Sequence, residues 1–183
     1  NDDGKIIDDL IAYKLSDQRA LICVNAANIK KDYEWISSKT NNFDIKLTNE
    51  SQDYSLIAVQ GPKAVSILKS ALELPSLENL STYGVLEFKG SIIARTGYTG
   101  ENGFEVFGNH ETIKNLWKSL IEKGVTPCGL AARDTLRLEA CYPLYGQELS
   151  EKITPLDCGL KWTVKLGKQD FIGHKALRNY QPN

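Results

Sequence analysis

The chain has 183 residues, with 22 Lys and Arg against 23 Asp and Glu, so its formal net charge is -1, and 42% of its positions are hydrophobic. This composition is typical of a globular protein, and a chain of this length buries a sizeable core without disulfides or a metal ion. A near-zero charge without a basic block argues against a nucleic-acid-binding protein, because such proteins gather Lys and Arg on one face.

The N-terminal part of the chain predicts a β-hairpin followed by a helix and a strand. Residues 5–15 alternate in the manner of a strand, and residues 20–25 form a second β-rich run after the turn residues 16–18. Asn28 is placed to cap a helix whose apolar residues recur at i, i+4 and i+7. Residues 43–47 then predict another strand.

Strands and helices continue beyond a polar loop, 48–53, which predicts a domain boundary. The expected strands cover residues 54–60, 83–88, 91–96 and 104–107. The expected helices cover residues 62–72, the segment from the cap Asn109 to the terminator Gly124, and residues 130–141. Because hairpins and separated helices replace a regular βαβ alternation, the sequence predicts an α+β fold of antiparallel sheets flanked by helices.

Several classes of protein lack support in the sequence. The apolar runs are far shorter than the ~20 residues of a membrane-spanning helix, and the first residues do not have the pattern of a secretory signal. The four cysteines form no C-x-x-C pair and only two histidines are present, so neither a disulfide framework nor a metal site is predicted. Reduced thiols in a cytoplasm-like compartment are expected. Because the chain has no methionine and opens in a turn, we expect it to be part of a longer protein.

Two adjacent carboxylates, Asp8 and Asp9, lie in an otherwise apolar predicted strand. One of them therefore faces a core or a cleft, where burial and neighbouring groups decide its protonation. Two interpretations stay open. In the structural one, a carboxylate meets solvent while the other pairs with a cation or backbone donors. In the functional one, a buried carboxylate acts on a basic nitrogen.

The segment 95–101 contains glycines at a spacing of three and invites comparison with phosphate-binding loops. The comparison fails because such loops deliver the phosphate to a helix N-terminus, whereas a strand, 104–107, follows here. We expect these glycines to permit a tight connection with positive φ. In the following strand Glu105 lies opposite Phe104, which is consistent either with a solvent-facing residue or with a group that enters a pocket.

Three further polar residues have simple alternatives. Arg133 either pairs locally with Asp134 or grips a ligand carboxylate through its planar fork. His110 and His174 are isolated, so we assign them no chemistry, and the sequence supports no Ser-His-Asp or Cys-His arrangement.

Five motifs, taken together in order and spacing, resemble the T protein family of the glycine cleavage system, the aminomethyltransferases. The motifs are weak individually, and the resemblance extends over essentially the whole chain. They are Ile7-Asp8-Asp9-Leu10-Ile11, Asn25-Ala26-Ala27-Asn28, Gln60-Gly61-Pro62, the segment from Arg95 to Glu105, and the segment from Gly129 to Glu139.

The resemblance implies that an aminomethyl group on the lipoyl arm of H protein is broken down with release of ammonia. Its methylene passes to tetrahydrofolate, the co-substrate, so lipoylated H protein and a folate are the implied partners. In the family motif the catalytic carboxylate falls on Asp9. The implied folate-contacting residues are Ile11, Asn25, Tyr98, Glu105 and Arg133, with Glu105 at the pterin-binding position and no metal ligand among them.

The resemblance also implies two α+β domains, residues 1–48 and residues 49–183, with the second leading towards a C-terminal barrel that this chain lacks. The implied compartment is the cytoplasm of a bacterium or the mitochondrial matrix of a eukaryote. Two kinds of relative share the fold and stay open as alternatives: other tetrahydrofolate-dependent demethylases or one-carbon transferases, and non-catalytic folate-binding proteins. A plain α+β interaction module is a third alternative, and without the missing segments this chain alone is expected to be inactive.

Overall fold

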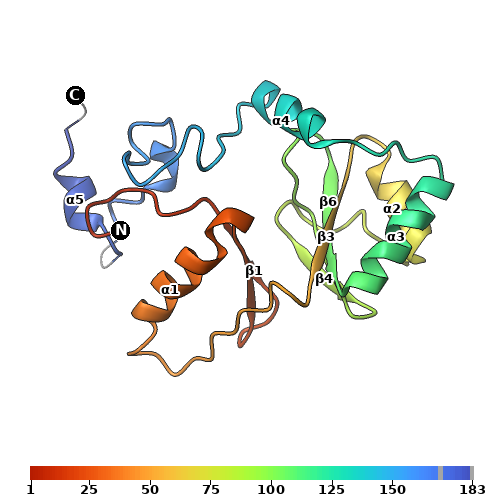
Figure 1. Ribbon diagram of the computed structural model, residues 1–183, viewed down its shortest axis with the longest axis horizontal. Helices are drawn as coiled ribbons and strands as arrows, with labels where there is room; N and C mark the ends of the chain where they lie inside the picture. Colours follow the sequence, from red (N-terminus) through yellow and green to blue (C-terminus); the bar gives the residue numbers. More distant parts are fainter. Residues whose placement is uncertain (169–170, 182–183) are drawn as a thin grey trace. The chain divides into compact units, whose positions relative to one another are not determined.

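The computed structural model describes residues 1–168 and 171–181, and within them antiparallel sheets alternate with helices (Figure 1). The predicted α+β class is therefore confirmed. The chain divides into two compact units. Unit 1 consists of residues 1–11, 23–47 and 143–183, and unit 2 consists of residues 12–22 and 48–142.

Unit 1 is built from helices and irregular segments. Its main helix is α1 (Ile29–Lys39), preceded by the 3-10 turn η1 (Ala26–Asn28). A second 3-10 turn, η2 (Lys161–Thr163), and a short helix, α5 (His174–Arg178), belong to its C-terminal part. The N-terminal segment is tied to that part by a hydrogen bond from the Ile6 amide to the Ile153 carbonyl, at 3.1 Å.

Unit 2 contains most of a hairpin and a four-stranded antiparallel sheet. The hairpin pairs β1 (Ile11–Lys14) with β2 (Ala20–Cys23). The larger sheet has the strand order β3-β6-β5-β4. Its strands are β3 (Ser55–Gln60), β4 (Val85–Phe88), β5 (Ser91–Ala94) and β6 (Gly103–Gly108).

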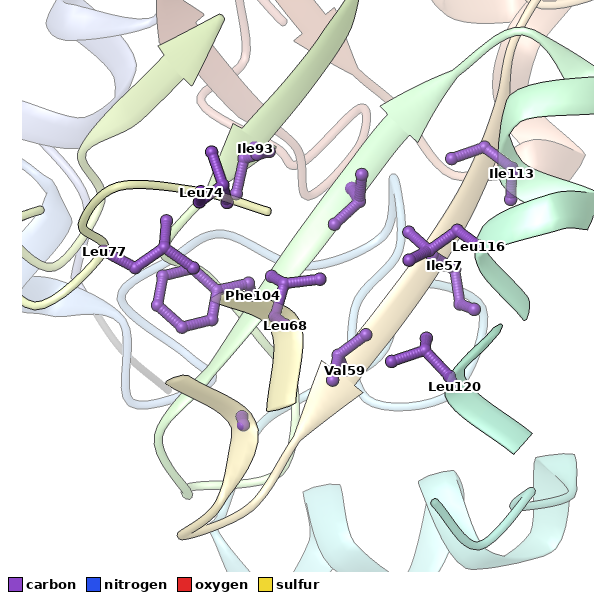
Figure 2. Packing of buried hydrophobic residues seen from close by; sticks show 12 residues of the cluster. Ile57, Val59, Leu68, Leu74, Leu77, Ile93, Phe104, Ile113, Leu116 and Leu120 are labelled. Atoms are coloured by element: carbon purple, nitrogen blue, oxygen red, sulfur yellow. The ribbon is translucent and has the colours of Figure 1, made fainter. Parts of the chain in front are cut away.

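Helices α2 (Ala64–Leu72) and α3 (His110–Glu122) pack against each other and against β3 and β6 of this sheet (Figure 1). The core lies between the sheet and these helices (Figure 2). The side chains of Leu68, Ile93 and Phe104 are completely buried there. Each contributes about 1.5–3 kcal/mol by leaving water. A further helix, α4 (Leu130–Glu139), follows α3 in the chain.

The strand register places Glu105 on the face of β6 opposite the core. Glu105 pairs with Ala58 on one side and Ala94 on the other. Because side chains alternate along a strand, Phe104 and Val106 enter the core while Glu105 points to the other face. The packing of the core therefore fixes the face of β6 on which this carboxylate lies.

One predicted strand is too long and another is wrong, because β1 covers only residues 11–14 of the strand predicted over residues 5–15. Residues 5–10 lie outside any strand, and so do residues 43–47. In the first segment the backbone groups bond to partners other than a strand, including the side chains of Lys31 and Asn25. In the second, the side chains of Phe43 and Ile45 are mostly exposed, so alternation alone did not supply a partner strand or a buried face.

The predicted helix ends are confirmed at one helix and wrong at another. The Asn109 side chain caps α3 by accepting a hydrogen bond from the Thr112 amide at 2.8 Å, and Gly124 follows that helix with φ of 78°. Asn28, in contrast, makes no capping hydrogen bond with its side chain. In the part of the chain that the structure describes, no helix has the length and hydrophobicity needed to cross a membrane.

Candidate functional site

The Asp8 carboxylate in unit 1 is held by three N–H donors. The Asn25 side chain donates to Oδ1 at 2.8 Å and the Asn25 backbone amide donates to Oδ2 at 3.1 Å. The Asn28 side chain donates to Oδ1 at 2.7 Å, which explains why it does not cap α1. Three donors on one carboxylate fix its orientation and favour its charged form.

Asp9 has the opposite environment. Its backbone carbonyl accepts a hydrogen bond from the Asn25 side chain at 3.0 Å, whereas its carboxyl group accepts none from the residues that the structure describes. Burial, and then the charge of Asp8, raise the pKa of Asp9. Burial also opposes the charged form of Asp8, but the hydrogen bonds that it accepts outweigh burial and lower the pKa of Asp8. Asp8 is thus a fixed anion, whereas the Asp9 carboxyl group has no hydrogen-bond partner among the described residues.

Both carboxylates line a cavity of about 350 Å³ that lies within unit 1. The N-terminal segment forms one part of its wall, and α1 contributes Asp32 and Trp35. Apolar residues, among them Leu149 and Leu160, make up most of the remaining wall, and Lys5 also lines the cavity. An acidic edge on a largely apolar wall suits a ligand that carries a basic nitrogen on an apolar body.

Two residues of α1 that the sequence did not single out also reach this region. Lys31 donates through Nζ to the Ile7 carbonyl at 2.5 Å and bonds the Tyr145 hydroxyl at 2.8 Å. Asp32 is only 3% exposed, and its carboxyl oxygens accept no hydrogen bond from the described residues. Burial and the nearby Asp8 carboxylate raise the pKa of Asp32 to about 7. Nothing in the sequence indicated these contacts, because adjacent charged residues such as Lys31 and Asp32 are common near the start of a helix.

Glu105 in unit 2 belongs to a buried hydrogen-bond network. Its Oε2 accepts from the Thr96 hydroxyl at 2.5 Å and from the Tyr13 hydroxyl at 3.2 Å. The two hydroxyls are also within 3.0 Å of each other, and the Tyr13 ring packs edge-on against Phe107 with 5.5 Å between centroids. Its other oxygen, Oε1, accepts no hydrogen bond from the residues that the structure describes. One oxygen of Glu105 is therefore anchored, while the second can accept further hydrogen bonds.

The glycine-containing segment after β5 wraps around the side chain of Gln60. Gln60 Nε2 donates to the Thr96 carbonyl at 3.1 Å and to the Phe104 carbonyl at 3.2 Å. A Cβ atom at Gly97 or Gly103 would lie 2.0 Å or 2.2 Å from Gln60 Oε1, so a side chain at either position would displace the Gln60 amide. Only Gly100 among the glycines of this segment has positive φ, at 74°. The expectation of positive φ is therefore wrong for Gly97 and Gly103, where close approach is the cause.

Tyr98 and Arg133 lie together in unit 2. The Arg133 guanidinium carbon lies 4.5 Å from the centroid of the Tyr98 ring, a cation–π distance. On that ring stacks Tyr142, with centroids 5.7 Å apart. The local ion pair weighed for Arg133 is not formed, because Asp134 pairs with Arg137 at 2.8 Å instead. The exposed Arg133 guanidinium is therefore free to bind an anionic group.

Among the sequence-predicted residues, the structure brings Asp9 together with Asn25, and Tyr98 together with Arg133. Ile11 begins β1 and is half-buried. Tyr13 and Thr96, which anchor Glu105, were not recognised from the sequence. Tyr13 is separated from Thr96 by 83 positions and from Glu105 by 92, and no local pattern connects residues so far apart. The ring nitrogens of His110 bond Ser55 Oγ and the Gln52 carbonyl, both at 2.8 Å, in a structural arrangement.

Comparison with known proteins places the chain among similar sequences and structures. The family model described as GCVT N-terminal domain matches residues 1–168. A curated aminomethyltransferase of Lysinibacillus sphaericus is 46% identical over 184 residues, which cover 96% of this chain and 50% of that protein. The aminomethyltransferase of Thermosipho melanesiensis is also 46% identical, with 97% of this chain and 50% of that protein covered.

A solved structure gives the same picture. The crystal structure of glycine cleavage system aminomethyltransferase T from Bartonella henselae matches with a TM-score of 0.89 and 34% sequence identity. The match covers 97% of this chain and 50% of that chain. This chain thus spans about half the length of the curated relatives that it matches.

Proposed function

The chain belongs to the GCVT N-terminal domain family, and on that premise we propose that it acts as part of a tetrahydrofolate-dependent aminomethyltransferase of the glycine cleavage system. The proposed reaction takes the aminomethyl group carried on the lipoyl arm of H protein, releases ammonia and passes the methylene to tetrahydrofolate. Lipoylated H protein and tetrahydrofolate are the corresponding partners, and a reducing compartment such as a bacterial cytoplasm is the proposed location.

The observation that carries this proposal is the contrast between Asp8 and Asp9. Asp8 is held by three N–H donors, whereas the Asp9 carboxyl has no partner among the described residues and lines a cavity. We assign the catalytic role to Asp9, because only a carboxyl that is not already engaged can orient an amine, accept a proton from it or stabilise a developing positive charge. The raised pKa of Asp9 supports proton transfer at this group.

The proposed folate contacts follow from the chemistry that each side chain offers. Glu105 offers the free Oε1 beside an anchored Oε2, and a carboxylate suits the adjacent N–H and amino donors of a pterin ring. Arg133 suits the carboxylates of a folate, and Tyr98, whose ring contacts Arg133 and Tyr142, is the proposed aromatic contact beside it. Asn25 and Ile11 complete the proposed set. The donors of Asn25 are engaged with Asp8 and Asp9, so it would meet the ligand through its amide oxygen.

Removing the Glu105 carboxylate should weaken folate binding. Calorimetric titration of tetrahydrofolate into this chain and into a Glu105→Ala variant tests the assignment, and we expect the variant to bind at least tenfold more weakly. A charge-assisted hydrogen bond of about 1.5–3 kcal/mol accounts for a loss of this size. Glu101→Ala serves as the matched control, because Glu101 is an exposed carboxylate of the preceding segment. Equal affinity of wild type and Glu105→Ala would remove Glu105 from the site.

Replacing the Asp9 carboxyl with an amide should nearly abolish turnover and leave folate affinity almost unchanged. The assay uses a chimera in which this chain replaces the matching half of the Lysinibacillus sphaericus relative. We expect Asp9→Asn to lower kcat by at least a hundredfold, in line with loss of a general acid or base. Asp44→Asn, at an exposed carboxylate of the same unit, is the control. Unaltered turnover in Asp9→Asn would contradict the catalytic assignment.

A further inference from the structure

The segment that carries Asp8 and Asp9 pairs with no strand in the described part of the chain, and it is held by side chains of η1 and of the first turn of α1. Asn28 donates to the Asp8 carboxylate at 2.7 Å, and Lys31 donates to the Ile7 carbonyl at 2.5 Å. Residues 28, 31 and 32 are spaced at i, i+3 and i+4, so they share one face of the helix. Asp32 therefore lies on the same helix face as Asn28 and Lys31, which both hydrogen-bond the segment that carries Asp8 and Asp9.

Asp32 is the unusual member of this face. Its carboxyl group is only 3% exposed, yet neither oxygen accepts a hydrogen bond from the described residues. It lines the cavity of unit 1 together with Asp8 and Asp9. A buried carboxylate with neither a cation nor a donor is expensive, and adjacent carboxylates disfavour full ionisation of the group. One of the three acids should therefore retain a proton.

The hydrogen bonds indicate which acid retains it. Asp8 is held charged by three N–H donors, and Asp9 is more exposed than Asp32. The proton belongs on Asp32, where a neutral acid becomes a donor. A carboxylate has about four lone-pair sites, and the three donors on Asp8 occupy two at Oδ1 and one at Oδ2, which leaves one site at Oδ2.

We propose that Asp32 is a positioning residue, a neutral carboxylic acid that donates its proton to the remaining acceptor site of Asp8 and thereby keeps the Asp8–Asp9 pair in its functional orientation. With Asp8 tied to Asn25, Asn28 and Asp32, the neighbouring Asp9 carboxyl stays directed to a ligand. The inference rests on the proposed function only in giving Asp9 the reacting role; the arrangement of the three acids stands without it.

The electrostatics of the cavity are consistent with this arrangement. Burial and Asp8 raise the pKa of Asp32 to about 7, Glu151 acts in the same direction, and Lys31 opposes them. Lys31 is itself 3.4 Å from Glu151. Other charged groups that line the cavity are Asp9, Lys5 and the amino group of Asn1. The pull of Lys31 on Asp32 is thus opposed by Asp8 and Glu151.

Carboxyl-carbon NMR on this chain, with aspartate labelled at Cγ, tests the arrangement without any ligand. In wild type we expect the Asp32 signal to titrate between pH 6 and 8 and the Asp8 signal to show a second, small step at the same pH. Asp32→Asn keeps an N–H donor, so it should abolish the step but leave the signal of the Asn25 amide, which bonds Asp8 Oδ2, unchanged. Asp32→Ala removes the donor and should shift both the Asp8 carboxyl and the Asn25 amide.

Titration of Asp32 in wild type below pH 5 would overturn the proposal, and this measurement needs no variant to fold. Identical Asp8 and Asn25 signals in Asp32→Ala and wild type would overturn it as well. The chimera with the Lysinibacillus sphaericus relative adds a kinetic test. In the chimera, Asp32→Ala should lower kcat at least tenfold with little change in KM for tetrahydrofolate. Asp32→Asn, which keeps a donor, should retain most of the wild-type kcat. An equal loss of kcat in both variants would contradict donation to Asp8.

The outcomes separate the two proposals. Failure of tetrahydrofolate to bind, combined with the expected titration of Asp32, would refute the proposed function and leave the positioning role intact. Normal folate binding and turnover combined with an acidic titration of Asp32 would refute the positioning role alone.

Discussion

A carboxylate on a half-buried strand keeps one direction only when neighbouring donors hold it. At Glu105 the holders are Thr96 and Tyr13, whose hydroxyls converge on Oε2. Tyr13 lies far from Glu105 in the sequence, so the network ties the hairpin strand β1 to the large sheet within unit 2. The direction of the proposed pterin-binding group is therefore a property of three residues rather than of one.

Tyr13→Phe tests the network at the scale of a single oxygen atom. The variant keeps the ring that packs on Phe107 and removes the hydroxyl that bonds Thr96 and Glu105. We expect the free energy of unfolding to fall by about 1–2 kcal/mol, because buried hydrogen bonds are lost and one acceptor keeps fewer donors. Urea denaturation measures the change, with Tyr83→Phe at an exposed tyrosine as control. A loss no larger than in the control would show that Tyr13 acts through packing alone.

At the scale of elements, both a cap and a buried face in the sequence specify helix α3. The start of α3 is marked by Asn109, and its buried face by Ile113, Leu116 and Leu120 at helical spacing. A cap satisfies a backbone N–H that has no partner within the helix. Packing and capping thus specify the same element.

Asn109→Ala should destabilise α3 by about 1 kcal/mol, the usual cost of losing an N-cap side chain. The lost interaction is the 2.8 Å hydrogen bond from the Thr112 amide. Asn115→Ala is a matched control, because Asn115 is an exposed asparagine in the middle of the same helix, where alanine is the better helix former. Chemical denaturation compares the two variants, and equal stabilities would mean that the cap contributes nothing measurable.

Agreement between such local signals decides how much of the fold and of the candidate site could be predicted from the sequence. The strands at 55–60 and 103–108 and the helix α3 were predictable, because their periodicity, caps and turns all favour the same elements. Of the strand expected over residues 5–15, only residues 11–14 formed one, since a strand needs a partner edge that alternation cannot reveal. Glu105 was placed correctly on its strand face.

Residues that act over long sequence distances were beyond local patterns. Gln60 fills the space beside Gly97 and Gly103, a steric cause that the glycine spacing alone did not distinguish from positive φ. Asp32 lies in the first turn of α1, where an acidic residue is ordinarily explained by the helix dipole. Its burial beside Asp8 depends on how the N-terminal segment returns to the helix, which no short-range pattern encodes.

At the scale of the whole molecule, the acids of unit 1 predict how its stability changes with pH. The pKa of Asp32 is raised to about 7 in the folded chain, whereas an unfolded aspartate has a pKa of about 3.9. Between these values the folded state binds more protons than the unfolded state, so the free energy of unfolding falls as pH rises from about 4 to 7. Asp8 acts in the opposite sense at lower pH, because its pKa is lowered and its stabilisation is lost on acidification.

Asp32→Asn should therefore remove much of the decrease in stability between pH 4 and 7, since the amide does not titrate and each unit of pKa difference corresponds to about 1.4 kcal/mol. Urea denaturation followed through the indole NMR signals resolves the two units, because Trp35 belongs to unit 1 and Trp117 to unit 2. The difference between wild type and variant should appear at Trp35, and Trp117 is the internal control. Parallel pH profiles of the two proteins at Trp35 would mean that Asp32 is ionised at neutral pH. A buried Asp32 anion would then need a cationic partner, and no salt bridge to Asp32 is present in the described part of unit 1.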